Sequence, residues 1–177
     1  MDINGILDIA KTAPVIREKS ALPAFVKKVP IAVAQDKAFC FIYPENIELM
    51  EAMGAEIIPF SPLEDKSLPE SIGGLYLCGG YPELYKEQLS QNHNLLKAIR
   101  NAVADGLPTI AECGGFMYLS ESLDGFPMVG ALPAKAYRTD KLQRFGYITL
   151  TARQDNLLCK AGENIPAHEF HYYDSTD

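Results

Sequence analysis

The sequence predicts an α/β protein built on an open, mostly parallel sheet with helices on both faces. Short apolar runs alternate with longer helix-like stretches between residues 31 and 119, and turn residues separate them. The apolar run at 107–111 passes directly into a Cys-Gly-Gly turn and then into a further helical stretch. Strands that alternate with helices in this way pair in parallel, because each helix returns the chain to the same end of the sheet.

Residues 1–29 have a different character from the rest of the chain. Apolar residues at helical spacing between residues 2 and 10 predict a short helix, and the prolines and charges that follow predict a linker. A buried strand is then expected at 31–34, followed by a helix from Glu45 to Met53. The apolar residues expected on the inner side of that helix are Ile47, Leu49, Met50 and Met53.

The remaining elements continue the same alternation. Further strands are expected at 56–60, 74–78 and 107–111, and helices near 83–89, near 94–104 and from the Cys-Gly-Gly turn to Leu119. After Gly125 the pattern changes to short β-type segments, expected at 129–132, 145–150 and around 169–172. These last segments either extend the parallel sheet or form an antiparallel edge.

Composition excludes several classes of protein. With 177 residues, 47% of them hydrophobic, the chain can bury one substantial core. A net charge of -7 provides no basic surface for phosphates, and no apolar run approaches the roughly 18 residues of a membrane span, so neither nucleic acid nor membrane is an expected partner. The four cysteines have no metal-binding or disulfide spacing, which indicates a reduced, cytoplasmic protein without a metal site: Cys40, Cys78, Cys113 and Cys159.

The junction between the strand at 107–111 and the next helix is the strongest chemical signal. A sharp turn of this kind holds one side chain above the sheet and points the next backbone N–H groups toward the same place. Cys113 is the residue that such a turn would present, and Gly114 and Gly115 give the turn room. The sequence therefore predicts a nucleophilic cysteine, although a buried structural cysteine before a tight turn has the same local pattern.

A second signal is the glycine pair Gly79-Gly80 after the strand at 74–78. The carboxyl ends of parallel strands form the ligand crevice of an open sheet, so this loop is expected close to Cys113. Glycine lets the backbone approach a ligand and direct its N–H groups inward, as an oxyanion hole requires. A plain turn before Pro82 would also explain the pair.

A cysteine nucleophile needs an imidazole within reach, and two candidates lie near the end of the chain. Strand alternation places His171 and Glu169 on one face and His168 and Phe170 on the other. Spacing alone does not decide which histidine faces the thiol, and a hydrogen-bonded surface histidine is the simpler alternative for both.

These motifs together resemble the glutamine amidotransferase domain of the cobyrinic acid a,c-diamide synthase family. The resemblance spans residues 31 to 173, where the motifs occur in one order: Phe60-Ser61-Pro62-Leu63, Gly79-Gly80-Tyr81-Pro82-Glu83, Ala111-Glu112-Cys113-Gly114-Gly115-Phe116-Met117-Tyr118-Leu119, Gly146-Tyr147 and His168-Glu169-Phe170-His171. It implies a class I glutamine amidotransferase fold, which is flavodoxin-like and has three layers. It also implies L-glutamine as the substrate.

The resemblance also implies the roles of the site residues. Cys113 corresponds to the attacking cysteine, and His171, the second histidine of its motif, corresponds to the activating base. Most class I relatives carry a glutamate two residues after this histidine, whereas Tyr173 stands here, so Glu169 and Glu112 are the auxiliary candidates. The residues predicted to bind substrate or oxyanion are Gly79, Gly80, Gly114, Tyr81 and Arg138.

The resemblance further predicts a fragment of a larger enzyme. Residues 1–29 resemble the tail of a preceding ATP-binding domain and its linker, and residues 30–177 resemble an amidotransferase domain that is truncated at its C-terminus. The G-x-x-x-x-G-K-[ST] phosphate loop does not occur, so ATP and Mg²⁺ would belong to the missing domain and this part needs no cofactor. The expected partner is an ATP-binding synthase domain, in the same chain or as a separate subunit, and a homodimer is compatible with the sequence.

Three alternatives remain open at this stage. The ammonia could be directed to cobyric acid or to a nickel-sirohydrochlorin, because the corresponding enzymes share this half. Glu112 before Cys113 is also similar to thiol hydrolases and redox-sensing domains of related architecture. A binding module that only docks an ATPase half would leave Cys113 unreactive.

Overall fold

The computed structural model describes residues 2–15, 25 and 28–176. The helical segments are α1 (Ile3–Lys11), α2 (Pro44–Ala52), the 3₁₀ turn η1 (Pro82–Leu84), α3 (Lys86–Gln91), α4 (His93–Ala104) and α5 (Gly114–Leu119). The strands are β1 (Val29–Ala34), β2 (Ala55–Phe60), β3 (Gly74–Leu77), β4 (Thr109–Ala111), β5 (Ser120–Leu123), β6 (Phe126–Pro127), β7 (Leu132–Arg138), β8 (Arg144–Thr151), β9 (Asn164–His171) and β10 (Tyr173–Ser175).

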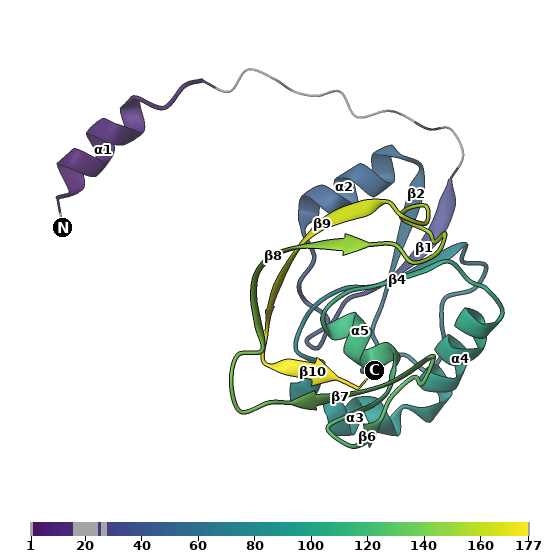
Figure 1. Ribbon diagram of the computed structural model, residues 1–177. Coiled ribbons are helices and arrows are strands. Elements are labelled where there is room, and N and C mark those ends of the chain that lie inside the picture. The colour runs from purple at the N-terminus through teal and green to yellow at the C-terminus, as the bar shows by residue number, and fades with distance from the viewer. Residues whose placement is uncertain (1, 16–24, 26–27, 177) are drawn as a thin grey trace.

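A four-stranded parallel sheet in the order β2-β1-β3-β4 forms the centre of the fold. The chain moves from β1 to β2 in one direction and from β3 to β4 in the other. Because parallel crossovers are right-handed, these two connections lie on opposite faces, which places α2 on one face and α3 and α4 on the other (Figure 1). The predicted fold class, a mostly parallel sheet flanked by helices on both faces, is confirmed.

The core lies between this sheet and its helices. All four residues of β3 are buried, as expected for a central parallel strand covered on both faces. The buried face of α4 carries Leu95, Leu96 and Ile99. The ring of Phe39 meets that of fully buried Tyr118 edge-on, with 5.2 Å between centroids, so the loop after β1 packs onto α5.

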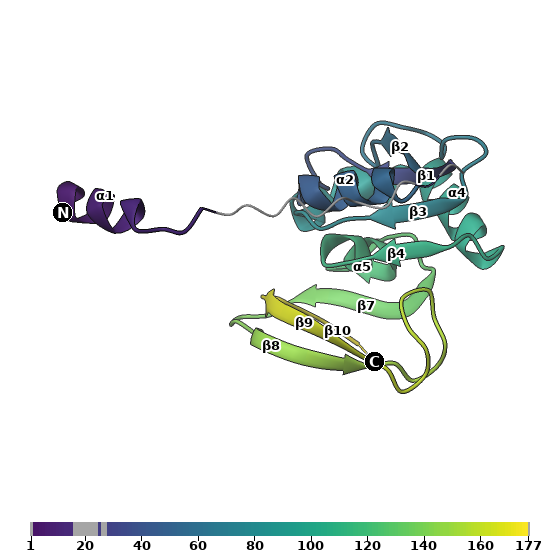
Figure 2. The same cartoon turned by 90° about the horizontal axis from the view of Figure 1, so that it is seen from above.

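The second half of the chain adds a smaller β layer. The strands β10-β7-β5-β6 form a mixed sheet in which β5 and β7 are parallel, while β8 and β9 pair as a separate antiparallel hairpin. Helix α5 contacts β3 and β4 on one side and β5 and β7 on the other, so it joins the two layers. Figure 2 shows α5 between β4 and the strands β7 to β10.

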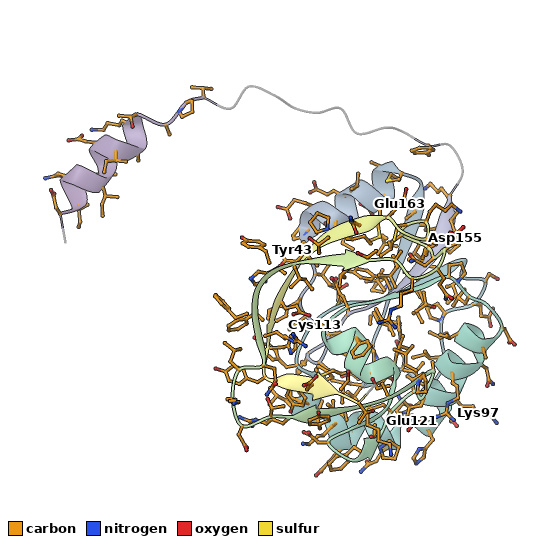
Figure 3. All side chains as sticks on the ribbon, viewed as in Figure 1. Tyr43, Lys97, Cys113, Glu121, Asp155 and Glu163 are labelled. Atoms are coloured by element: carbon orange, nitrogen blue, oxygen red, sulfur yellow. The ribbon has the colours of Figure 1, made fainter. Side chains whose placement is uncertain are left out.

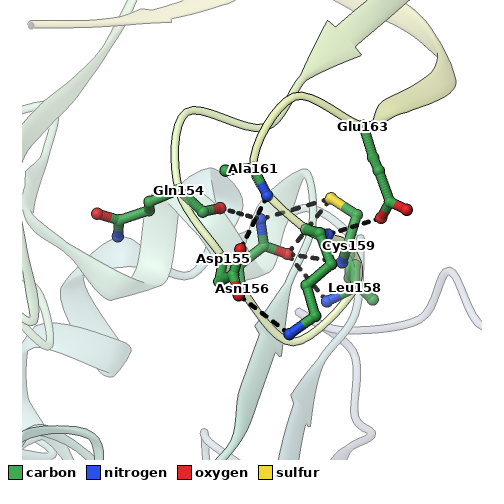
Figure 4. A network of polar contacts seen from close by, with 8 residues as sticks. Gln154, Asp155, Asn156, Leu158, Cys159, Ala161 and Glu163 are labelled. Carbon is green, nitrogen blue, oxygen red and sulfur yellow. Dashed lines mark hydrogen bonds and ion pairs between the residues drawn. The ribbon is translucent and has the colours of Figure 1, made fainter.

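The loop between β8 and β9 is held by its own polar groups (Figure 4). Asn156 Oδ1 accepts hydrogen bonds from the backbone N–H groups of Leu158 and Cys159, at 2.9 and 3.1 Å. The carboxylate of Asp155 accepts from the Ala161 N–H and from the ammonium of Lys160, each at 3.0 Å. The long loop of residues 152–163 is therefore held in shape by its own side chains.

The helix predicted at the N-terminus is present as α1. Its N-cap residue Asp2 accepts a hydrogen bond from the Gly5 N–H at 3.0 Å. No residue of α1 is buried, and Ile3, Ile6 and Ile9 are exposed. The predicted linker lies largely outside the described residues. Within the described ranges, no helix has the length and apolar character that crossing a membrane requires.

Two details of the sequence prediction are wrong. Leu49 and Met53 were expected on the inner side of α2, but both are exposed, and only Ile47 and Met50 are half-buried. The segment 129–132 was expected to be β-type, but β7 begins only at Leu132. The N–H groups of residues 129–131 bond instead to carbonyls at the end of α5 and the start of β5, because the chain turns there.

Candidate active site

Cys113 occupies a strained turn between β4 and α5. Its backbone angles, φ 50° and ψ −111°, lie where a non-glycine residue pays a steric cost. The turn is fixed on both sides, because the Glu112 N–H donates to the Leu77 carbonyl at 3.1 Å and the Gly115 N–H donates to the Glu112 carbonyl at 2.8 Å. Cys113 is exposed at the start of α5 (Figure 3), as the sequence predicts for a nucleophile held above the sheet.

The Gly79-Gly80 loop lies directly against this turn. A Cβ on Gly79 would stand 3.4 Å from the Cβ of Cys113. A Cβ on Gly114 would stand 3.1 Å from the amide nitrogen of Gly80, so the two backbone segments are neighbours. Gly80 itself has no room for a side chain, since a Cβ there would come within 2.1 Å of the Ala38 carbonyl oxygen. The strands thus bring the two predicted glycine motifs together.

The N–H groups of Gly80 and Gly114 are free of protein acceptors among the described residues. Gly114 is the first residue of α5, whose N–H has no partner within the helix. Two free N–H groups beside an exposed thiol can together hold a negatively charged oxygen.

The two candidate histidines lie on opposite faces of β9. Along this strand, burial alternates residue by residue, and His171 and Glu169 are on the partly buried face, whereas His168 is on the exposed one. The ring of His168 contacts the exposed rings of Phe145 and Tyr147, with centroid distances of 6.2 and 5.3 Å. The alternation predicted from the sequence is therefore confirmed.

The imidazole of His171 has one defined partner. Its Nδ1 lies 2.5 Å from the backbone carbonyl oxygen of Tyr173. A carbonyl oxygen only accepts hydrogen bonds, so Nδ1 must carry the proton, and Nε2 of the neutral ring is left as an acceptor. This tautomer is the one that a general base acting through Nε2 requires.

Cys113 and His171 are connected only through intermediate elements, because His171 lies on β9, which pairs with β8. Cys113 directly precedes α5, α5 contacts β7, and β7 pairs with β10, which starts two residues after His171. Figure 2 shows β9 and β10 beside β7, in the β layer next to α5. Within the described contacts, the thiol and the ring form no hydrogen bond; such bonds are often longer in unliganded enzymes and tighten when substrate binds.

The other predicted site residues have separate surroundings. The exposed ring of Tyr81 packs on Phe41, with 5.1 Å between ring centroids. The carboxylate of Glu112 accepts a short hydrogen bond from the Tyr76 hydroxyl. Burial, followed by this contact with Glu112, raises the pKa of Tyr76 above its ordinary value. Arg138 ends β7 opposite Tyr173.

Asp124 was not singled out by the sequence and holds a polar cluster near these residues. Its Oδ2 accepts from Lys86 Nζ at 2.7 Å and from the Tyr173 hydroxyl at 3.1 Å, and its Oδ1 accepts from the Arg138 N–H at 2.9 Å. Burial alone would raise the pKa of Asp124, but the hydrogen bonds from Lys86 and Arg138 hold it below its usual value. The dipeptide Asp124-Gly125 is a turn signal in the sequence. The residues that bond to the Asp124 side chain are distant in the sequence and carry no such signal.

Glu83 stands beside this cluster. Burial raises the pKa of its carboxyl group, and the nearby charge of Asp124 raises it further, while Lys86 and Arg138 act in the opposite direction. Its Oε2 is buried and has no hydrogen-bond partner among the described residues.

A hollow of about 520 Å³ opens between α2 and the segment that follows β1. Its lining does not include Cys113 or His171, and consists of Gln35, Asp36, Phe39, Cys40, Ile42, Pro44, Ile47 and Glu48. In the part of the chain that the structure describes, no group of three or more His, Cys, Asp or Glu side chains is placed to hold a metal ion.

The fold and this turn define an α/β protein that presents a cysteine on a nucleophile elbow. Residues 30–176 match the family described as CobB/CobQ-like glutamine amidotransferase domains. The chain belongs to that family, as its motifs predict.

Proteins named cobyrinate a,c-diamide synthase are similar over nearly the whole chain. The protein from Caldanaerobacter subterraneus is 46% identical, that from Dehalococcoides mccartyi strain CBDB1 41% and that from Methanobrevibacter smithii 43%, each over 97% of this chain. The chain spans 39% of the length of each of these relatives. A crystal structure of a glutamine amidotransferase aligns with 68% of this chain and 62% of its own, at 19% identity and a TM-score of 0.48.

Proposed function

We propose that this chain hydrolyses glutamine to glutamate and ammonia as the glutaminase part of a cobyrinate a,c-diamide synthase. The observation that carries the proposal is the exposed Cys113 in its strained turn, beside the free N–H groups of Gly80 and Gly114. Family membership supports glutamine as the substrate. The names of the relatives support cobyrinate, rather than cobyric acid or a nickel-sirohydrochlorin, as the final acceptor of the ammonia.

The reaction begins with proton transfer. Nε2 of His171 takes the proton of the Cys113 thiol, and the sulfur attacks the side-chain amide carbon of glutamine. The amide oxygen becomes negatively charged and accepts hydrogen bonds from the N–H groups of Gly80 and Gly114. The amide nitrogen then takes the proton from His171 and leaves as ammonia, so that a glutamyl thioester remains on Cys113.

Water completes the cycle. His171, again neutral, takes a proton from water as the oxygen attacks the thioester carbon, and the departing Cys113 sulfur recovers that proton. The products are glutamate and the free thiol. Arg138 is the candidate partner for the α-carboxylate of glutamine, because it is a cation at the exposed end of β7. Tyr81 is the candidate for the rim of the pocket, and Glu112 and Glu169 are auxiliary candidates.

The ammonia needs an acceptor that these residues do not supply. Because the chain spans 39% of the length of these synthases, we assign carboxylate activation, with its ATP and Mg²⁺, to an ATP-binding synthase domain. We assign residues 30–177 to the glutaminase domain and residues 1–29 to the tail of that other domain and its linker. The acceptor carboxylates are those of the a and c side chains of cobyrinic acid.

Glutamate release tests the proposal. The wild-type chain should release glutamate from glutamine, and Cys113→Ala should release none above background. Cys40→Ala is the matched control, because Cys40 is also an exposed free cysteine but lies outside the elbow. Equal activity of Cys113→Ala and wild type would refute the assignment, and an inactive wild type would favour a redox-sensing or docking role.

A further inference from the structure

A series of hydrogen bonds links Asp124, through Tyr173, to the ring of His171. We propose that Asp124 and the Tyr173 hydroxyl are positioning groups that hold the Tyr173 carbonyl against Nδ1 of His171. This inference deepens the proposed function and rests on it, since it concerns the base of the same reaction.

The first step of the argument is the tautomer. With Nδ1 bonded to the Tyr173 carbonyl at 2.5 Å, the proton of the neutral ring stays on Nδ1 and Nε2 remains free for the thiol. If that carbonyl moved away, either nitrogen could carry the proton, and the fraction of competent base would fall. The position of one carbonyl oxygen therefore controls the base.

The second step is that this carbonyl lies at a point where the chain changes sheets. His171 is the last residue of β9, which pairs with β8, and Tyr173 is the first residue of β10, which pairs with β7. Only Tyr172 separates them, and its carbonyl accepts from the N–H and the hydroxyl of Thr139 at 2.9 and 2.7 Å. Strand pairing alone is weakest at such a junction, because β10 has only three residues.

The third step is the anchor of Tyr173. Its hydroxyl donates to Asp124 Oδ2, which also accepts from Lys86. Asp124 sits in a two-residue Asp-Gly turn between β5 and β6, where both Asp124 (φ 49°) and Gly125 (φ 82°) have positive φ, as a type I′ turn requires. The Asp124 side chain is only 19% exposed, so its hydrogen bonds are partly shielded from water.

Together these contacts join three elements to the carboxylate of Asp124. Lys86 belongs to α3, the Arg138 N–H belongs to β7, and the Tyr173 hydroxyl belongs to β10, and all three bond to the one carboxylate of Asp124. The geometry makes Asp124 the fixed point from which the Tyr173 ring, and with it the carbonyl that orients His171, is held.

The test combines kinetics with ¹⁵N NMR of the histidine ring in the full chain. Tyr173→Phe removes only the hydroxyl and keeps the ring and the carbonyl. It should lower the kcat for glutamine by about 10-fold, the effect of losing one hydrogen bond to a charged group, and leave KM within about 2-fold. At a pH of about 8.5, where an ordinary imidazole is neutral, the ¹⁵N shifts of His171 should change from a single Nδ1-protonated tautomer to a mixture.

The controls separate positioning from folding. Tyr172→Phe changes the neighbouring exposed tyrosine and should leave both readouts at wild-type values. Asp124→Asn, which keeps a side chain that tolerates positive φ, should reproduce the tautomer mixture and serves if Tyr173→Phe does not fold. A wild-type His171 protonated on Nε2, or a wild-type tautomer in Tyr173→Phe, would overturn the inference. An inactive wild type would count against the proposed function alone, because the tautomer is measured without turnover.

Discussion

Cys78 and Cys113 follow neighbouring parallel strands, and the fold buries the first thiol while it exposes the second. Burial, with the charge of Glu112 as the next cause, raises the pKa of Cys78 to about 12. Its thiol lies 3.3 Å from the Ala34 carbonyl oxygen inside the core. Two cysteines at the same edge of the sheet therefore differ in chemistry because of their surroundings.

Alkylation should follow this difference. At pH 8, roughly one in ten thousand Cys78 thiols is ionised, so iodoacetamide should leave Cys78 unmodified while the exposed Cys113 and Cys40 react. Peptide mass spectrometry of the native chain measures this, and unfolding in guanidinium should make all four cysteines reactive. Native Cys78 labelled as fast as Cys40 would contradict the burial of this strand end.

Gly115 should not tolerate a side chain. A Cβ there would lie 2.1 Å from the Leu77 carbonyl oxygen, which is backbone and cannot move aside. Although alanine is normally better than glycine in a helix, Gly115→Ala should lower the free energy of unfolding by about 1–3 kcal/mol.

Urea denaturation measures the loss, with Gly106→Ala as the control. A Cβ on Gly106 meets no atom within 4 Å, so that variant bears only the strain of φ 88°, about 1 kcal/mol. A Gly115→Ala chain as stable as wild type would show that α5 does not approach β3 so closely.

The predicted parallel sheet follows from local signals in the sequence. Apolar runs such as 31–34 and 74–78 mark β1 and β3, and the Cys-Gly-Gly turn marks the start of α5. By contrast, β5 has the sequence Ser-Glu-Ser-Leu, which carries little strand signal, and it forms a strand because β7 and β6 pair with it on either side. The role of Asp124 was hidden for the same reason, since its partners are far away in the sequence.

The choice between the two histidines shows the same limit. Alternation correctly separated His171 from His168, but only packing shows that the side of His171 is the partly buried one. The Tyr173 carbonyl that orients the ring has no side-chain signal at all. Backbone partners of this kind are not visible in a sequence motif.

Loss of the hydroxyl group should change the free energy of unfolding differently at two buried tyrosines. The Tyr118 hydroxyl is buried and donates to no protein acceptor among the described residues, so Tyr118→Phe should leave the free energy of unfolding unchanged or raise it by up to about 1 kcal/mol. Tyr76→Phe loses the hydrogen bond to Glu112 and should lower it by about 1 kcal/mol. Thermal denaturation compares the two, and equal losses in both variants would contradict this difference in bonding.

Asp124 should stabilise the fold in a pH-dependent way. Its pKa is lower in the folded chain than the unfolded value of about 3.9, so its contribution is present above that value and is lost as the pH falls through the folded pKa. Asp124→Asn should therefore be less stable than wild type at pH 7, and the difference should shrink below a pH of about 4. Urea denaturation over this range measures it, with Asp140→Asn, at an exposed position, as the control.

If the stability difference between Asp124→Asn and wild type stayed constant from pH 7 to pH 3, the carboxylate would not be the group that ties β10 to α3. The same result would weaken the positioning of His171, because Tyr173 is anchored by that carboxylate.

Covalent trapping tests the assignment of the nucleophile most directly. The glutamine analogue 6-diazo-5-oxo-norleucine should alkylate the wild-type chain once, and peptide mapping should place the adduct on Cys113. Cys113→Ser should take up no label, while Cys40→Ser should be labelled as fully as wild type. An adduct on Cys40 or Cys159, or equal labelling of wild type and Cys113→Ser, would contradict the account.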